Sequence, residues 1–452
     1  MDLTAYRSLL RDSRARRLLA GLAVSSLGDG MSVVTIAWLA LTIAPSGDAG
    51  VYVGLAVAAY TLPGVIGGIT LGRFLRRRSP AVLVLAHSFL RAGSLAAIAA
   101  LSLAHALHPS TYVILLAASS LLTTWGTAGE YSLLADVGGA DGRLTANSFA
   151  TAQVSVATII GPLAAGILLT QFAAGWLLVL DAASFAVLGI VASGIATAPA
   201  PRAAAEMPPR HVSGFRLLRR RDLLSLTIVT WFFFLLYGPV EVALPFHVAR
   251  ELGASAQLLG AYWTSFALGA LTASLVTGAL RTGNVRGITI AIVAGWGACL
   301  LPFAFAPVPV TIVCFALGGL IYGPFGPLTY ALFQAATPAA DLPAVLAARG
   351  TVVIVSTLLG IALGGPLVSV LGGGGTLVAS GLATVLLAAV SLLLWPRESA
   401  SGRRVMGDAI EQLSRSRRGG RHPTMKVGTI NTRRGGISNE GHAEVRQEHH
   451  RD

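Results

Sequence analysis

A few ionisable side chains lie inside long apolar stretches of this chain. Asp29 lies about 12 residues beyond Arg17, or roughly 18 Å along a helix, and Arg91 reaches a similar depth from the same side. Ionisable groups inside a membrane are costly and mark functional sites by default. Asp29 and Arg91 could therefore form a pair whose carboxyl group exchanges a proton, or a permanent ion pair that joins two helices.

Three more acidic residues lie in apolar stretches. Glu241, in Gly238-Pro239-Val240-Glu241, lies about 28 Å along its helix and is expected near the outer mouth. Pro239 lacks a backbone N–H, so one carbonyl oxygen of the helix is left without its hydrogen bond. Two explanations for Glu241 are therefore considered: a role in gating or proton transfer, and a solvated position at the rim that needs no special function. Glu130 lies towards the cytoplasmic end of its stretch. Asp181 lies in the outer half of its apolar stretch, and a structural role through hydrogen bonds is favoured for this residue. The candidates for proton coupling are Asp29, Glu241 and Arg91.

Aromatic residues are distributed over several of the apolar stretches. Together with Glu130, we take Trp38, Trp125, Tyr237 and Tyr322 as candidates for lining a cavity that accepts a large, fairly apolar ligand. Interfacial anchoring and plain packing are the competing explanations for each of these aromatic residues.

Twelve apolar stretches hold all of these residues. A bilayer core about 30 Å thick needs about 20 apolar residues per spanning helix. The sequence therefore predicts an all-α integral membrane protein. The predicted spans are 17–43, 51–72, 80–105, 110–135, 147–170, 173–198, 222–247, 256–281, 286–307, 309–336, 350–371 and 375–395.

The arginines fall mostly in alternate connections between the spans, which indicates the orientation of the chain. Basic residues favour the cytoplasmic side, so both termini are expected there, in a multi-pass protein of the cell membrane. Hydrophobic residues make up 54% of the chain and charged residues 12%. The net charge of +13 is therefore attributed to topology and not to nucleic-acid binding.

The chain is expected to consist of two related halves. Asp29 and Glu241, and likewise Gly161-Pro162 and Gly365-Pro366, occupy equivalent spans about 205–212 residues apart. Such duplication is typical of transporters whose site lies between the halves near the bilayer midplane. Gly161 and Pro162 are expected to be structural, as part of a smooth or bent helix surface. The expected parts are a six-helix bundle at 1–198, a cytoplasmic linker at 199–221, a second bundle at 222–396 and a disordered basic tail at 397–452.

The order of several motifs resembles the major facilitator superfamily, in particular its drug:proton antiporter branch with macrolide-efflux and enterobactin-exporter proteins. The likeness covers about residues 5–395. The motifs that carry it are Ser26-Leu27-Gly28-Asp29-Gly30-Met31, Gly72-Arg73-Phe74-Leu75-Arg76-Arg77-Arg78, Leu144-Thr145-Ala146-Asn147, Leu180-Asp181-Ala182-Ala183-Ser184-Phe185 and Gly238-Pro239-Val240-Glu241-Val242-Ala243-Leu244-Pro245.

This resemblance implies two pseudo-symmetric six-helix bundles that alternate in access, with proton entry coupled to export of a hydrophobic or amphiphilic small molecule. Arg73, Arg76 and Arg77 would belong to the loop that controls the switch. The sequence differs from the family pattern at one position of this loop. Gly72 stands where the family has an acidic residue that helps to hold the two halves together in the outward-facing state. Asp136 is the possible substitute for that acidic residue.

Other functional classes remain as alternatives. The exported compound could be a siderophore or another secreted metabolite, and a receptor or scaffold on this fold would bind a ligand without moving it. An enzyme is not expected because the sequence lacks a catalytic cluster, and no cofactor or metal is expected. The expected partners are the small molecule, protons and lipid, and the chain is expected to be monomeric.

Overall fold

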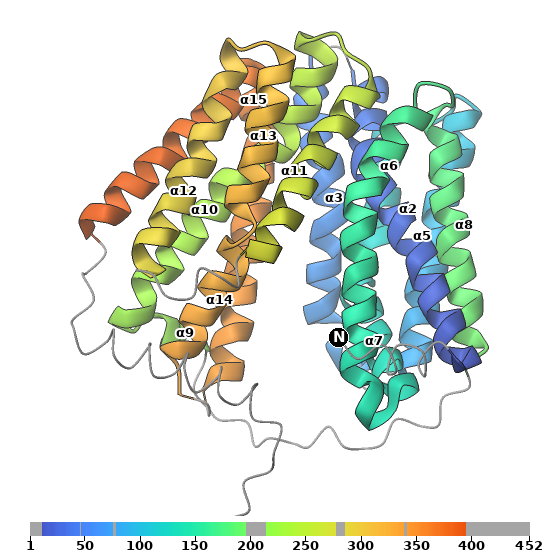
Figure 1. The fold of residues 1–452 in the computed structure, drawn as a ribbon. Coiled ribbons are helices and arrows are strands. Elements are labelled where there is room, and N and C mark those ends of the chain that lie inside the picture. The colour runs from blue at the N-terminus through green and yellow to red at the C-terminus, as the bar shows by residue number, and fades with distance from the viewer. Residues whose placement is uncertain are drawn as a thin grey trace, which may run out of the picture. The chain divides into compact units, whose positions relative to one another are not determined.

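The computed structural model describes residues 11–45, 47–75, 78–195, 214–276, 285–338 and 341–394. Within these ranges the chain is helical and contains no β-strand. Figure 1 shows long helices that run alongside one another. Most of the predicted linker and the whole predicted tail lie outside the described residues.

The first half of the chain forms six apolar spans. The helices are α2 (Ser13–Ile43), α3 (Ala49–Thr70), the short α4 (Gly72–Leu75), α5 (Pro80–Leu103), α6 (Pro109–Ser120), α7 (Thr123–Leu168) and α8 (Ala174–Ser193). Helix α6 and the first part of α7 together make the fourth span, and the second part of α7 makes the fifth. Asp12 caps α2, because its carboxylate accepts the backbone N–H of Arg14 at 2.7 Å.

The second half forms the remaining spans. Its helices are α9 (Gly214–Leu218), α10 (Arg221–Phe246) with a π-helical turn at His247–Glu251, α11 (Ala256–Val276), α12 (Val285–Leu300) with a 3₁₀ turn at Leu301–Ala304, α13 (Val308–Tyr322), α14 (Phe325–Ala335) and α15 (Leu342–Leu394). Gly372 interrupts α15 with φ 73° and ψ 178°, a conformation that glycine adopts without a Cβ clash. Two helices therefore follow one another within α15, and the predicted turn between the last two spans is present.

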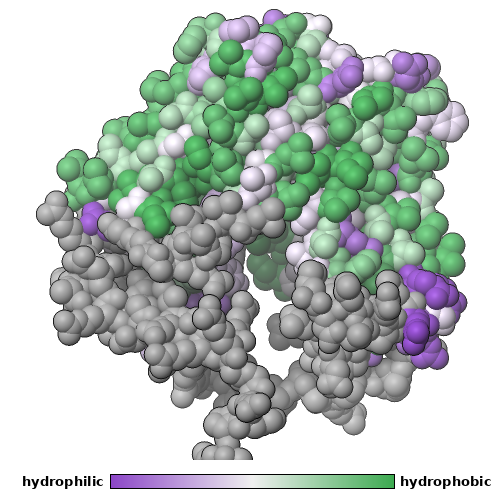
Figure 2. All heavy atoms as spheres, in the orientation of Figure 1, coloured by the Kyte–Doolittle hydropathy of each residue, from purple (hydrophilic) through white to green (hydrophobic). Residues whose placement is uncertain are grey.

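The described helices confirm the predicted fold class. Ten segments are long and apolar enough to span a membrane, the longest being the 50 residues of Ala344–Leu393. This longest segment divides at Gly372, and α11 adds a further apolar helix of 21 residues. Large apolar side chains are widely exposed, and Figure 2 shows a mostly hydrophobic described surface, as contact with lipid requires.

Two helix starts differ from the prediction by more than two residues. The first span begins at Ser13 instead of 17, because Asp12 starts the helix within the polar basic segment. The eleventh begins at Leu342 instead of 350. There Arg349, which hydropathy places outside the span, is only 7% exposed and donates to the hydroxyl of Thr329 at 2.9 Å.

Helices of the first six and last six spans meet toward one end of the molecule, which we call the closed end. There Arg250 donates from Nη2 to the carbonyl oxygen of Leu41 at 2.9 Å. Deeper along the same contact, Thr264 of α11 donates to the carbonyl oxygen of Ile159 at 3.0 Å. Helix α3 also lies against α15, and a Cβ on Gly50 would come within 2.7 Å of Val368. Small residues thus let the helices approach closely at this end, which is opposite the start of α2.

Candidate functional site

A cavity of about 590 Å³ lies between helices of the first and last six spans. Helices α2, α7, α10 and α11 contribute its walls, and Figure 2 shows the surface hollowed near the centre of the view. The lining residues are Ser26, Asp29, Gly30, Val33, Val154, Ser155, Thr158, Ile159, Pro162, Tyr237, Glu241, Trp263, Phe266, Ala267, Ala270 and Leu271. The cavity thus brings together two carboxyl groups from opposite halves of the chain.

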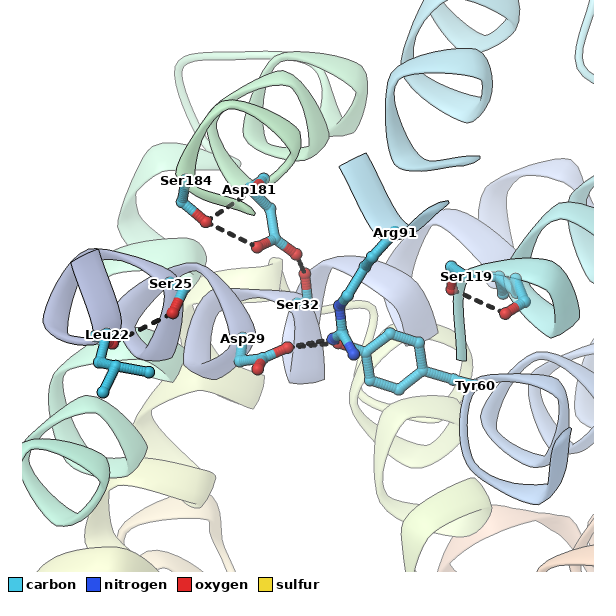
Figure 3. Close-up of polar contacts among 10 residues, drawn as sticks. Leu22, Ser25, Asp29, Ser32, Tyr60, Arg91, Ser119, Asp181 and Ser184 are labelled. Atoms are coloured by element: carbon cyan, nitrogen blue, oxygen red, sulfur yellow. Dashed lines mark hydrogen bonds and ion pairs between the residues drawn. The ribbon is translucent and has the colours of Figure 1, made fainter. Parts of the chain in front are cut away.

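Asp29 forms the ion pair that its depth predicted. Arg91 donates through Nη2 to both Asp29 Oδ1 and the hydroxyl oxygen of Tyr60. The Tyr60 hydroxyl donates in turn to Asp29 Oδ1 at 2.9 Å. Figure 3 shows the three side chains converging from α2, α3 and α5. The Asp29 side chain is 45% exposed and faces the cavity, whereas that of Arg91 is 4% exposed.

The buried arginine is held by more than its carboxylate. Its guanidinium lies 4.8 Å from the ring centroid of Tyr60 and 4.5 Å from that of Phe185. Such contacts stabilise a desolvated cation. Tyr60 was missed in the sequence, although a simple depth count would have found it. It lies about 11 residues into a helix that runs in the opposite direction, so it reaches the same layer as Asp29.

Asp181 lies behind this pair, away from the cavity lining. Ser32 donates to one oxygen of its carboxylate. The Ser184 hydroxyl donates to the backbone carbonyl oxygen of Asp181 at 2.7 Å and lies 3.3 Å from the other carboxylate oxygen. Asp181 is 1% exposed, and a Cβ on Gly28 would collide with its carboxylate. The glycine before Asp29 therefore makes room for Asp181, whose hydrogen bond from Ser32 joins α8 to α2.

The expected position of Glu241 near the outer mouth is wrong. Its side chain lines the same cavity as Asp29. Helix α10 continues as a π-helical turn to Glu251, so Glu241 lies about 15 Å before the end of the helix instead of close to it. Tyr237, one turn earlier, interacts with its carboxyl group.

Only one of the five cavity candidates is in the lining. Tyr237 lines the cavity, whereas Trp38, Trp125, Glu130 and Tyr322 are not among its described lining residues. The aromatic residues are used in packing instead: Trp38 against the hydrophobic core, Trp125 through a hydrogen bond to the carbonyl oxygen of Gly67 at 3.0 Å, and Tyr322 on Tyr237 with ring centroids 5.3 Å apart. Glu130 instead lies near enough to Arg91 to interact electrostatically.

The aromatic lining residues that the sequence analysis missed are Trp263 and Phe266 of α11. Their spacing, with Ala267 and Ala270 on the same face, follows the helical repeat and could have indicated a shared face.

Comparison with known proteins identifies the fold. A family model described as the Major Facilitator Superfamily matches residues 18–247 and 226–425. The chain belongs to this superfamily. It is thus a multi-pass membrane protein of a transporter family, with a small molecule as its substrate.

Solved structures of several transporters are similar to this chain. The nucleoside transporter NupG has a TM-score of 0.65 and 14% identity, with 85% of this chain and 100% of that chain covered. The peptide transporter POT, in complex with sulfate, has a TM-score of 0.64 and 12% identity, covering 86% and 95%. A bacterial homologue of human Spinster, inward-facing and unoccupied, has a TM-score of 0.63 and 12% identity, covering 87% and 96%. No curated protein sequence matches the chain significantly.

In this major facilitator protein the predicted switch loop is only partly described. Arg73 belongs to α4, and Arg76 and Arg77 lie outside the described residues. Asp136, the possible substitute for the loop acid at Gly72, has an exposed side chain.

Gly161 and Pro162 lie where α7 crosses α2. A Cβ on Gly161 would lie 2.6 Å from the Cα of Gly30 and 2.8 Å from the backbone nitrogen of Met31. Pro162 lines the cavity, and its carbonyl oxygen would meet a Cβ on Gly260 of α11. The crossing thus needs glycine on both α2 and α7 and lies directly beside Asp29.

Proposed function

We propose that this protein exports a hydrophobic or amphiphilic small molecule, such as an antibiotic, in exchange for protons. The observation that carries the proposal is the cavity-facing carboxyl group of Asp29, held against a buried arginine. A buried cation favours the ionised form of a neighbouring carboxyl group, whereas a low-dielectric surrounding favours the protonated form. A group held between these influences exchanges a proton when access to the cavity changes.

The proposed movement is alternating access between two six-helix bundles, with the linker and tail on the cytoplasmic side. If the arginine-rich connections are cytoplasmic, the closed end faces outward and the cavity is accessible from inside. Substrate binds in this state. The bundles then rock, the cavity opens outward, and Asp29 takes up a proton as the substrate leaves.

Proton transfer gives Arg91 two alternative sets of partners. With Asp29 ionised, its Nη2 donates to both Asp29 and Tyr60. After protonation of Asp29, the electrostatic attraction is lost, and the guanidinium retains Tyr60, the Phe185 ring and the nearby charge of Asp181. Arg91 is thus a positioning residue for the proton-coupling carboxyl group.

The test uses efflux-deficient bacteria that express the full chain. The accumulation of ethidium, Hoechst 33342, doxorubicin and Nile red is compared between the original chain, Asp29→Asn and the control Asp48→Asn, at matched protein levels. Asp48 is also an aspartate but is exposed and precedes α3, away from the cavity. Lower accumulation that a proton uncoupler reverses, and that Asp29→Asn but not Asp48→Asn abolishes, is expected.

Other results would change the proposal in defined ways. Export that survives Asp29→Asn would remove Asp29 from coupling. An absence of export for every dye would favour a siderophore or other secreted metabolite as the compound to assay next. Ligand binding without transport in any assay would favour a receptor.

A further inference from the structure

The two carboxyl groups in the cavity differ in their electrostatic partners. Asp29 is paired with Arg91. Within the part of the chain that the structure describes, Glu241 has no cationic partner, and the groups that interact with it are the neutral Tyr237 and Tyr322. No lysine, arginine or histidine is among the described lining residues. The cavity therefore has one carboxyl group that the protein itself does not neutralise.

An aromatic wall lies beside this carboxyl group. Tyr237, Trp263 and Phe266 all belong to α10 and α11, so the wall and Glu241 belong to the same half of the chain. More aromatic rings pack behind it. The ring of Phe266 lies 5.2 Å from that of Phe315 and 5.5 Å from that of Trp296, which is itself fully buried. This packing holds the wall in position before a ligand binds.

The charge of the cavity selects among ligands. An ionised carboxyl group in a membrane needs a compensating cation, and without one it is held neutral by a proton. Aromatic faces attract cations and repel anions because of their negative quadrupole. An anionic ligand would meet Asp29, Glu241 and these rings with no free cation in the described lining to offset them.

We propose that the cavity binds a lipophilic cation, with its positive charge against Glu241 and its apolar body against Tyr237, Trp263 and Phe266. This inference rests on the proposed function, since it names the substrate class of the same cavity. A volume of about 590 Å³ suits one drug-sized molecule. Glu241 is then neutralised by ligand or by proton in turn, in addition to the proton that Asp29 takes up in the proposed cycle. On this assignment we expect multiply anionic siderophores not to bind the cavity.

Two ions of nearly equal size and opposite charge test this assignment. Tetraphenylphosphonium and tetraphenylborate are titrated against the purified full chain in nanodiscs, and binding to protein-free nanodiscs is subtracted. We expect saturable binding of the phosphonium and none of the borate. Glu241→Gln is expected to weaken phosphonium binding about tenfold or more, because it removes the opposing charge. Asp48→Asn is the control and leaves binding unchanged.

Additional variants keep the test valid if Glu241→Gln fails to fold. Glu241→Asp retains the charge and is expected to keep affinity within about threefold. Phe266→Leu retains an apolar side chain but removes a ring, and is expected to weaken binding about threefold. Equal binding of both ions, or Glu241→Gln and Glu241→Asp affinities that do not differ, would overturn the assignment.

The binding experiment and the export assay can fail independently of each other. Charge-selective, Glu241-dependent binding without export in cells would keep the cation site and overturn the proposed function. Asp29-dependent export of neutral or anionic compounds, without phosphonium binding, would keep the exporter and overturn the cation site.

Discussion

Removal of the acid from the Asp29–Arg91 pair should destabilise the protein more than removal of the arginine. The reason is the unequal burial of the two side chains, which are 45% and 4% exposed. Asp29→Leu leaves a buried guanidinium without its partner, and its Nε already lacks a hydrogen bond in the described structure. Arg91→Met leaves a carboxylate that water in the cavity can solvate.

The burial of each remaining charge sets the expected magnitudes. Breaking a buried pair so that a buried charge remains costs about 3–5 kcal/mol. The lower end applies to Asp29→Leu, because Asp181 also interacts electrostatically with Arg91. Exposed pairs contribute about 0–1 kcal/mol, so we expect about 1 kcal/mol for Arg91→Met, whose side chain fills much of the same volume. The double variant should resemble Arg91→Met, since neither variant retains the buried guanidinium.

The assay is unfolding of the purified variants in mixed micelles, followed by tryptophan fluorescence under one set of conditions. The predicted order of stability is the original chain, then Arg91→Met and the double variant together, then Asp29→Leu. Equal destabilisation by Arg91→Met and Asp29→Leu would contradict unequal burial as the cause. So would a double variant that is no more stable than Asp29→Leu.

Three further predictions concern helix contacts. Gly161→Ala should destabilise the α2–α7 crossing by about 1–3 kcal/mol and slow transport, whereas Gly93→Ala, with no neighbour within 4 Å of the added Cβ, should be neutral or stabilising in the same unfolding assay. Arg250→Ala removes the bond to Leu41 and should open the closed end, raising labelling of a cysteine introduced at Ser26 by an external thiol reagent about tenfold. The matched control, Arg286→Ala, removes an equally long bond to Leu392 within the second half and should leave labelling unchanged. Asp181→Leu should cost about 1–3 kcal/mol in unfolding by leaving the buried hydroxyl of Ser32 without its acceptor, and Asp181→Asn clearly less.

Hydrophobic length and periodicity predicted the spans because a bilayer imposes a nearly fixed helix length. Most observed helix starts lie within a few residues of the predicted ones, and the larger error at Leu342 arises from a polar side chain that is buried. Depth counting also predicted the contact between Asp29 and Arg91, since both helices enter from the same side.

The cavity wall was harder to predict. Which face of a span points inward depends on helix rotation, and apolar residues surround nearly the whole circumference of these helices. The sequence therefore does not distinguish Trp38 and Trp125, which pack against other parts of the protein, from Trp263, which lines the cavity. Glu241 was misplaced because the sequence does not reveal the π-helical extension of α10.

Proton flux in a purified system tests whether transport is coupled to protons through Asp29. The protein is reconstituted in liposomes with an acidic lumen, and uptake of the dye that it exports best in cells is recorded beside protein-free liposomes. Antiport predicts dye accumulation in the lumen, accompanied by proton loss, that vanishes when nigericin collapses the gradient and in Asp29→Asn. Dye movement that is equally fast without the gradient, or unchanged in Asp29→Asn, would contradict proton coupling through Asp29.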